Sequence, residues 1–146
     1  MPTVDPIPAE YGSVSCYLVL RDCAKAIDFY AKVFGGTERM RMPMPDGKIG
    51  HAELLIGNRI VMLADGNETF PPTNALLCLC VEDCDAVFDG AIAAGATVIE
   101  AVTDKFYGDR AGTLADPFGQ RWSIITHKED VSPDEMRARM AKLTGG

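Results

Sequence analysis

Two histidines supply the clearest acid–base chemistry in this chain of 146 residues. His51 and Glu53 alternate along a segment with strand character, so both side chains are expected on one face. If that face lines a cavity, Glu53 could orient His51 as a general base; if it faces water, both are solvated polar side chains. His127 follows the last expected strand and could be a base at a cavity mouth or an ordinary surface histidine. These three residues are the catalytic candidates.

A second group of residues could bind a ligand rather than move a proton. The segment FYGDR, at 106–110, combines aromatic rings, an acid and a base around a glycine. Beside a pocket, Tyr107 could stack on a ligand and Arg110 could pair with an anion. The alternative is an ion pair between Asp109 and Arg110 that rigidifies the loop. Trp122, the single tryptophan, could face a cavity or belong to the core. The ligand-binding candidates are Tyr107, Asp109, Arg110 and Trp122.

Composition and charge exclude several classes of protein. The formal net charge is −7 and the 14 lysines and arginines are scattered, so nucleic acid and anionic membranes are poor partners. No apolar run approaches the roughly 20 residues of a membrane helix, and the first residues lack the pattern of a signal peptide. Five cysteines without a CxxC pair fit reduced thiols, of which Cys78 and Cys80 are expected in the core. We therefore expect a soluble cytoplasmic protein.

The chain contains an internal repeat. LVLRDCAKAIDFYAKVFGG and LCVEDCDAVFDGAIAAGA both show an apolar strand, Asp-Cys, a helix and then glycine. Asp22 corresponds to Asp83, 61 positions later. IGNRIVML at 56–63 matches FGQRWSII at 118–125 with an offset of 62, which implies one inserted residue. Two matches in register indicate duplication of a supersecondary unit.

Each copy is expected to form a strand, a helix and three further strands. Asp22 and Asp83 can cap the two helices, and Gly35 and Gly95 suit the left-handed residue that ends them. The cysteine after each capping aspartate fits a small buried residue, and Gly-Asn after residue 56 fits a tight hairpin turn. The expected strands are 14–20, 38–42, 51–56 and 59–64 in the first copy, and 75–81, 97–101, 112–116 and 120–126 in the second.

The repeat also sets the expected organisation of the chain. The capping box at Ser132 begins a last helix, whose apolar edge of Met136, Met140 and Leu143 is expected to pack on the domain or on a partner subunit. The Met- and Pro-rich hairpin at 40–48 could rim a cavity, form a dimer contact or be an ordinary loop. The expected parts are an N-terminal arm (1–13), a first unit (14–65), a linker (66–74), a second unit (75–127) and a C-terminal helix (128–146).

Paired βαβββ units with these motifs resemble the vicinal oxygen chelate superfamily, which includes glyoxalase I, extradiol dioxygenases and bleomycin-resistance proteins. The resemblance covers residues 14–127 and is carried by YLVLRDCAKAIDFYAKVFGG, IGHAELLIGNRIVMLAD, FYGDRAGTLADPFGQRW and, just beyond it, THKEDVSP. Within the superfamily, the chain looks most like the PhnB-like branch. The resemblance implies an α+β fold in which each unit is a half-barrel sheet. Two such units would enclose a cavity, within one chain or between two chains of a homodimer.

The resemblance also implies four repeat-related strand positions for metal ligands. Here these positions fall on Ser15, Leu76, Val61 and Ser123, and a shift of one residue brings in only Cys16 as a possible ligand. Glyoxalase and extradiol mechanisms need carboxylate and imidazole ligands. We therefore expect the usual divalent metal site to be absent, and no cofactor is assigned.

The sequence leaves two functions open, and a third interpretation is a dimeric protein whose cavity is vestigial and binds nothing. The first is a protein of the antibiotic-resistance type, whose metal-free cavity binds an apolar or cationic small molecule. The second is a lyase, isomerase or dioxygenase of the glyoxalase type, which would use the acid–base candidates or a metal at a displaced site. Under both, we expect a homodimer with a small-molecule ligand and no nucleic acid or membrane partner.

Overall fold

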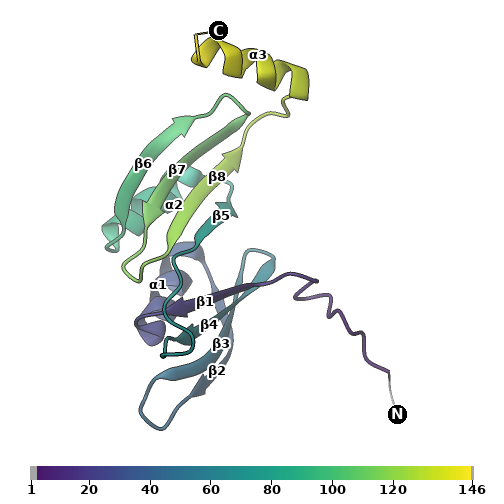
Figure 1. Cartoon of the computed structure of the whole chain (residues 1–146). Helices are drawn as coiled ribbons and strands as arrows, with labels where there is room; N and C mark the ends of the chain where they lie inside the picture. The colour runs from purple at the N-terminus through teal and green to yellow at the C-terminus, as the bar shows by residue number, and fades with distance from the viewer. Residues whose placement is uncertain (1–2, 146) are drawn as a thin grey trace. The chain divides into compact units, whose positions relative to one another are not determined.

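The computed structural model describes residues 3–145 and divides into two compact units, the first ending at Ala75 and the second beginning at Leu76. Each unit contains one four-stranded sheet and one helix between its first two strands, and the second unit carries a further helix at its C-terminal end (Figure 1). The chain is therefore an α+β protein of two βαβββ units, as the repeat predicts. No helix within residues 3–145 is both long and apolar enough to cross a membrane.

The first unit forms a mixed sheet in the strand order β1-β4-β3-β2. β1 runs parallel to β4, whereas β4 with β3 and β3 with β2 are antiparallel pairs. Gly57, in the turn between β3 and β4, has φ +60°, which the expected Gly-Asn hairpin turn requires. The elements are β1 (Cys16–Leu20), α1 (Cys23–Phe34), β2 (Thr37–Pro43), β3 (Ile49–Ile56) and β4 (Arg59–Asp65).

Local sequence features set both ends of α1. The Asp22 carboxylate accepts a hydrogen bond from Lys25 N at 3.3 Å, and Gly35 ends the helix at φ +69°. The apolar side of α1 packs on one face of the sheet, where Leu18 and Leu20 of β1 are fully buried. Because side chains alternate along a strand, Tyr17 and Val19 face away from α1.

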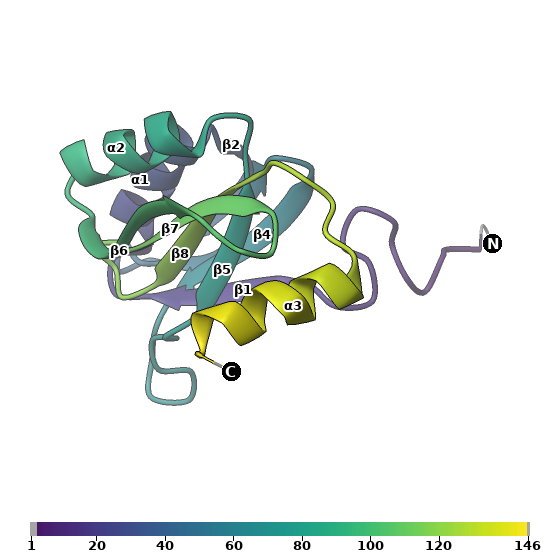
Figure 2. The same cartoon turned by 90° about the horizontal axis from the view of Figure 1, so that it is seen from above.

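The second unit repeats this architecture in the strand order β5-β8-β7-β6. β5 is parallel to β8, and the other two pairs are antiparallel. Asp83 caps the helix by accepting from Ala86 N at 3.1 Å, and Gly95 beyond its end has φ +117°. Figure 2 shows the helix α2 lying across one face of this sheet. The elements are β5 (Leu76–Cys80), α2 (Cys84–Ala93), β6 (Thr97–Asp104), β7 (Asp109–Ala115), β8 (Arg121–His127) and α3 (Pro133–Leu143).

Strand pairing corrects the offset of 62 that the sequence match gives for the last strand of each copy. In the first hairpin Leu54 pairs with Val61, and in the second Leu114 pairs with Trp122. All four side chains are buried, so the two pairs hold equivalent places under their helices. Seven residues separate the second pair and six separate the first. Val61 therefore corresponds to Trp122 at an offset of 61, the same as between the capping aspartates, and Leu54 corresponds to Leu114 at an offset of 60. The second hairpin holds one more residue than the first, and the expected offset of 62 between the last strands is wrong.

Two expected strand boundaries are wrong by three residues. β6 runs to Asp104 and does not end at 101. β7 begins at Asp109, three residues before the expected start at 112, so Asp109 and Arg110 lie in a strand and not in a loop. Asp109 pairs with His127 and Arg110 pairs with Thr126 of β8. The pairing with β8 thus extends the strand through two charged residues that carry no strand character of their own.

The cysteines divide into exposed and buried sets. Cys78 and Cys80 of β5 are exposed, so their expected place in the core is wrong. Because side chains alternate along β5, Leu77 and Leu79 face α2, and the two cysteines face the opposite side of the sheet. Cys23 and Cys84, which follow the helix caps, are buried as expected. Burial raises the pKa of Cys23 to about 12, so this thiol stays protonated.

α3 begins at the cap that the sequence predicts. Ser132 Oγ accepts from the backbone N–H three residues further on at 3.1 Å. Arg139 donates to Phe106 O at 3.0 Å and so anchors the helix to the loop before β7. No residue of α3 is buried, and Met140 and Leu143 are exposed. The domain therefore leaves the apolar edge of α3 uncovered within the described chain, and its packing on a partner subunit stays a prediction.

Candidate functional site

The face of the first sheet opposite α1, here called the open face, carries side chains that could do chemistry. Tyr17 pairs with Met62, and Met62 pairs with Glu53 across the next ladder. His51 lies two residues from Glu53 and therefore shares its face. The open face is defined by Tyr17, Val19, His51, Glu53, Met62 and Ala64.

A continuous chain of hydrogen bonds joins four side chains on this face. Tyr17 Oη lies 2.9 Å from His51 Nδ1, and His51 Nε2 lies 3.0 Å from Glu53 Oε2. Tyr11 Oη donates to the other carboxylate oxygen, Glu53 Oε1, at 2.6 Å. The ring centroids of Tyr17 and His51 are 5.5 Å apart. The structure thus brings His51 and Glu53 together and adds a tyrosine at each end.

Glu53 is the charged centre of this chain. The residue is 6% exposed. The hydrogen bond from Tyr11, followed by the one from His51, holds the pKa of Glu53 below its usual range, so it is ionised at neutral pH. The hydrogen bond to Glu53 raises the pKa of Tyr11, and burial raises the pKa of Tyr17. Both phenols therefore keep their protons and can donate hydrogen bonds.

The N-terminal segment is tied to the open face at two points. In addition to the contact between Tyr11 and Glu53, Glu10 forms an ion pair with Arg39 of β2, with 2.8 Å between Oε2 and Nη1. Ser15 Oγ donates to Tyr11 O at 3.0 Å and fixes the backbone that leads into β1. The N-terminal segment therefore contributes a side chain to the site.

Sequence reasoning missed both tyrosines. Tyr17 had a usable signal, because it alternates with Leu18 and must share the face opposite the buried leucines. Tyr11 had none, because its contact with Glu53 joins residues 42 apart and depends on the path of a segment without regular structure.

A cavity of about 800 Å³ opens beside Tyr17 within the first unit. Its volume lies in the range of small-molecule sites, roughly 300–1,000 Å³. The hairpin at 40–48, whose role the sequence left open, contributes part of its wall, and the segment after β4 contributes another. The lining residues that matter here are Tyr17, Val19, Met44, Asp46, Lys48 and Phe70.

The segment after β4 is held against the edge of β1. Thr73 N donates to Val19 O at 2.9 Å, and Gly66 N donates to Leu20 O at 3.0 Å. Thr73 Oγ1 also accepts from Val19 N at 3.2 Å. These bonds fix the wall that residues 66–73 give to the cavity, although this segment has no helix or strand.

The residues at the metal positions implied by the resemblance do not fit a metal ion. Of the four implied positions, Ser15 precedes β1, Leu76 begins β5 and Ser123 lies on β8, whereas Val61 lies on the face that α1 covers. The residue of β4 opposite Tyr17 is Met62, and the matching pair in the second unit is Cys78 and Ser123. Neither the four implied positions nor these two strand pairs hold a carboxylate or an imidazole. Within residues 3–145, no three His, Cys, Asp or Glu side chains form a group that could hold a metal.

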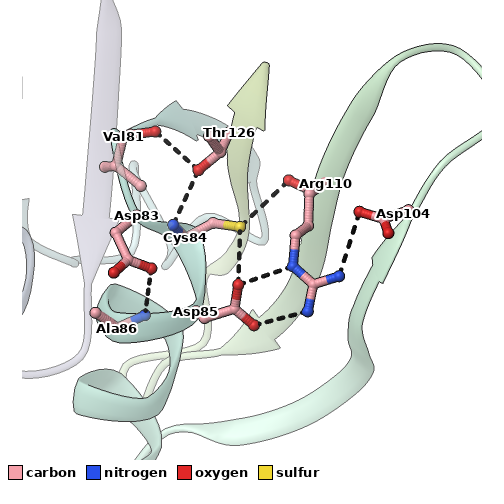
Figure 3. Close-up of polar contacts among 8 residues, drawn as sticks. All are labelled: Val81, Asp83, Cys84, Asp85, Ala86, Asp104, Arg110 and Thr126. Atoms are coloured by element: carbon pink, nitrogen blue, oxygen red, sulfur yellow. Dashed lines mark hydrogen bonds and ion pairs between the residues drawn. The ribbon is translucent and has the colours of Figure 1, made fainter. Parts of the chain in front are cut away.

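Arg110 makes contacts that neither expected alternative describes (Figure 3). Its Nε and Nη2 lie 2.8 and 2.9 Å from the two carboxylate oxygens of Asp85 in the first turn of α2. Its Nη1 lies 3.2 Å from Asp104 at the end of β6. The hydrogen bonds to these carboxylates raise the pKa of Arg110. The expected ion pair with Asp109 is wrong, and the guanidinium instead ties α2 to β6 and β7.

Asp109 pairs with His127. His127 Nδ1 lies 2.6 Å from Asp109 Oδ1, and Nε2 lies 2.7 Å from Asp130 Oδ1. The hydrogen bond to Asp109, followed by that to Asp130, raises the pKa of His127. Because both ring nitrogens bind carboxylates, this imidazole is suited to be a cationic link between β7, β8 and the segment that leads to α3. It is poorly suited to take a proton from a ligand.

The two remaining aromatic candidates lie in different environments. Tyr107 is 37% exposed and packs edge to face on Phe106, with ring centroids 5.2 Å apart. Trp122 is 2% exposed, and its Nε1 donates to Asp116 Oδ2 at 2.9 Å. Trp122 therefore occupies the core, which was the second of its two expected roles. Tyr107 stays a candidate because its ring is accessible.

Comparison with known proteins identifies the family. The model of the glyoxalase/bleomycin resistance protein/dioxygenase superfamily matches residues 12–124. The chain belongs to this superfamily. An uncharacterized protein of Mycobacterium bovis, Mb0911c, is 42% identical over 145 residues, and the match covers 92% of this chain and 95% of that protein.

Solved structures show the same fold. TioX from Micromonospora sp. ML1 is 31% identical with a TM-score of 0.67, over 76% of this chain and 94% of that one. TnmS3 from Streptomyces sp. CB03234, described as an antibiotic binding protein, is 23% identical with a TM-score of 0.63, over 77% of this chain and 92% of that one. At that identity, the likeness to TnmS3 shows the fold alone.

Proposed function

We propose that this protein binds an apolar or cationic small organic molecule, without a metal ion, in the cavity beside Tyr17. The observation that carries the proposal is the cavity itself, about 800 Å³ within one unit. Tyr17, Met44 and Phe70 offer it two aromatic rings and a flexible thioether, and such walls take up apolar bodies of varied shape. Tyr17 also carries a hydroxyl, which can orient a ligand bound beside its ring.

The charge around the cavity favours a neutral or cationic ligand over an anionic one. Asp46 and Asp65 line the cavity together with one basic residue, Lys48. The ionised Glu53 is linked to Tyr17 through His51. The chain as a whole carries a formal net charge of −7. An ammonium group could also lie against the ring faces of Tyr17 or Phe70.

The relatives give the proposal further support. TnmS3 has the same fold and is described as an antibiotic binding protein. The residues at the implied metal positions, which lack carboxylate and imidazole, favour a ligand held by packing and hydrogen bonds. As part of the same proposal, we place the chain in the PhnB-like branch, on its THKEDVSP motif, and expect a cytoplasmic homodimer.

An acid–base enzyme of the glyoxalase type, a lyase, isomerase or dioxygenase, is the second candidate. The contact of His51 with Glu53 favours it, because a carboxylate that fixes an imidazole is a common general-base arrangement. The two candidates differ in turnover. An enzyme would lose turnover in His51→Ala while its fold is retained, whereas a binding protein shows saturable binding without turnover.

The proposal is tested by a screen of aromatic fragments against the isotope-labelled full chain, followed by nuclear magnetic resonance with EDTA present. Neutral and cationic bicyclic fragments are expected to shift the amides of Val19, Lys48 and Phe70 at saturation. Shifts confined to residues 106–110, or no saturable shifts with any fragment, would contradict the proposal.

A matched pair of variants separates cavity contacts from general stickiness. Phe70 is 64% exposed at the cavity and Leu143 is 69% exposed on α3. Phe70→Ala is expected to weaken fragment binding about fivefold, the equivalent of roughly 1 kcal/mol for a lost aromatic contact. Leu143→Ala is expected to leave the affinity unchanged. Equal losses in both variants would point to non-specific association.

A further inference from the structure

Tyr17 takes part in two structures at once. Its side chain lines the cavity, and its hydroxyl lies 2.9 Å from His51 Nδ1. Through His51 it reaches Glu53, whose second oxygen is occupied by Tyr11. The hydroxyl group of this cavity-lining residue is therefore the outer end of a hydrogen-bonded chain that begins at a buried carboxylate.

The directions of these hydrogen bonds follow from the ionised carboxylate. Glu53 can only accept, so Tyr11 Oη and His51 Nε2 must both donate to it. A neutral imidazole has one N–H group, and Glu53 takes it at Nε2. Nδ1 must then accept, and the only proton that the partner 2.9 Å away can give is that of Tyr17 Oη. With His51 neutral, Tyr17 therefore turns its proton inward and offers the cavity a lone pair.

Protonation of His51 reverses the outer end of the chain. An imidazolium donates from both nitrogens, so Nδ1 then donates to Tyr17 Oη while Nε2 keeps its bond to Glu53. The Tyr17 proton must rotate away from His51. The hydroxyl then offers the cavity a donor in place of an acceptor.

We propose that Tyr17 is a specificity-determining residue of the cavity, and that the protonation state of His51 selects the polarity of the hydrogen bond that Tyr17 offers to a ligand. This inference rests on the proposed ligand-binding function. With neutral His51 the favoured ligand is an aromatic or apolar molecule with an N–H or O–H donor. With protonated His51 the preference moves to a carbonyl or another acceptor.

Few titratable or charged groups surround His51. Glu53 on β3 and Tyr17 on β1 contact it directly, and Tyr11 contacts Glu53. The cross-strand neighbours on β2 are Met42 opposite His51 and Met40 opposite Glu53, and Met62 lies beside Glu53 on β4; none of these titrates. Arg39 and Glu10 are paired with each other, and Asp46, Lys48 and Asp65 line the cavity with Tyr17. His51 is thus the one imidazole of this hydrogen-bonded chain, and its protonation state sets the direction of its bond to Tyr17.

The hydrogen-bond directions are tested first, without any ligand. The chain has two histidines, so nitrogen-15 spectra of the imidazoles can be assigned with His127→Gln. Above the pH of its titration, His51 is expected as the tautomer with the proton on Nε2, and in Glu53→Gln this preference is expected to weaken. A His51 tautomer with the proton on Nδ1 would overturn the inference.

The effect on ligands is tested with two neutral bicyclic probes, indole, which carries one N–H donor, and 1-indanone, a ketone that only accepts. Exchanging one neutral hydrogen bond is worth about 1 kcal/mol, or roughly fivefold in affinity. The ratio of the indole to the 1-indanone dissociation constant is therefore expected to rise about fivefold or more from pH 8 to pH 5. Tyr17→Phe is expected to bind both probes with a ratio that does not change with pH.

The control is Asp134→Asn, which removes an exposed titratable group of α3 and is expected to keep the wild-type pH dependence. A constant ratio in the wild type, with both probes bound, would overturn the role of Tyr17 and leave the proposed function standing. Failure of the wild type to bind either probe at any pH would overturn the proposed function and this inference with it, whatever the tautomer of His51.

Discussion

The Asp116 carboxylate organises the turn between β7 and β8. It accepts hydrogen bonds from the backbone N–H groups of Phe118 at 2.8 Å and Gln120 at 3.0 Å, and from Trp122 Nε1 at 2.9 Å. Burying a carboxylate is costly unless donors of this kind surround it. One residue therefore fixes both the turn and the orientation of the largest side chain in the core of the second unit.

Replacing Trp122 by Phe tests how much its hydrogen bond to the Asp116 carboxylate stabilises the fold. Trp122→Phe removes one donor from a buried acceptor and is expected to lower the free energy of unfolding by about 1–3 kcal/mol. Urea denaturation followed by circular dichroism measures the change. Tyr107→Phe, an exposed ring, is the control and is expected to stay within about 0.5 kcal/mol. Equal stability of Trp122→Phe and the wild type would contradict the assignment.

His127 should make stability depend on pH. Its pKa in the folded state is raised by hydrogen bonds to Asp109 and then Asp130. A raised pKa means that the contribution is complete below the unfolded value, about 6.5, and is lost as the pH rises through the folded pKa. The difference in unfolding free energy between wild type and His127→Gln is therefore expected to be largest near pH 6 and to shrink towards pH 9. A difference that grows with pH would refute the link.

How far single residues could be predicted depends on how local their contacts are. The shared face of His51 and Glu53 follows from strand alternation, and their contact at 3.0 Å joins neighbours on one strand. The partners of Arg110 could not be predicted, because Asp85 is 25 positions away and depends on how α2 lies on the sheet. Side chains joined across elements need the packed fold before they can be assigned.

At the scale of elements, α2 packs so closely on its sheet that one position admits no side chain. A Cβ on Gly112 of β7 would lie 2.9 Å from Phe88 Cε2 of α2 and 2.9 Å from Val102 N of β6. A Cβ added to Gly90 of α2 would have no other atom within 4 Å. Glycine is therefore required by packing at 112 and is merely tolerated in the helix at 90.

These two glycines give a matched test of the packing. Gly112→Ala is expected to lower the free energy of unfolding by about 1–3 kcal/mol through overpacking against backbone and a buried ring. Gly90→Ala is expected to raise it by about 0.5–1 kcal/mol, because alanine is the better helix former. Thermal and urea denaturation measure both. A stabilised Gly112→Ala would show that the sheet and α2 are less closely packed than described.

The elements themselves were largely predictable. The capping aspartates, the terminal glycines and the apolar patterns gave both βαβββ units, because each of these features acts within a few residues. The start of β7 was missed because Asp109 and Arg110 join the strand through their pairing with β8. Tertiary pairing there outweighs the local preference of charged residues.

At the scale of the whole molecule, the two copies have diverged in what their open faces carry. The parallel strand pairs of the two units keep the offset of 61 residues, so Tyr17 and Met62 correspond to Cys78 and Ser123. On the next strand of the sheet, Met62 pairs with Glu53 of β3 in the first unit, and Ser123 pairs with Thr113 of β7 in the second. The duplication therefore conserved the fold, while the aromatic and acid–base set occurs in the first copy.

The most direct test of the account is a calorimetric titration of the chelator-treated full chain with 1-naphthylmethylammonium, an aromatic cation. The account predicts saturable binding at one site per chain, unchanged when Zn²⁺ or Mn²⁺ is restored and weakened about fivefold by Phe70→Ala, the loss of one aromatic contact. Saturable binding that returns only with the metal, or that is the same in Phe70→Ala, would contradict a metal-free ligand cavity in the first unit.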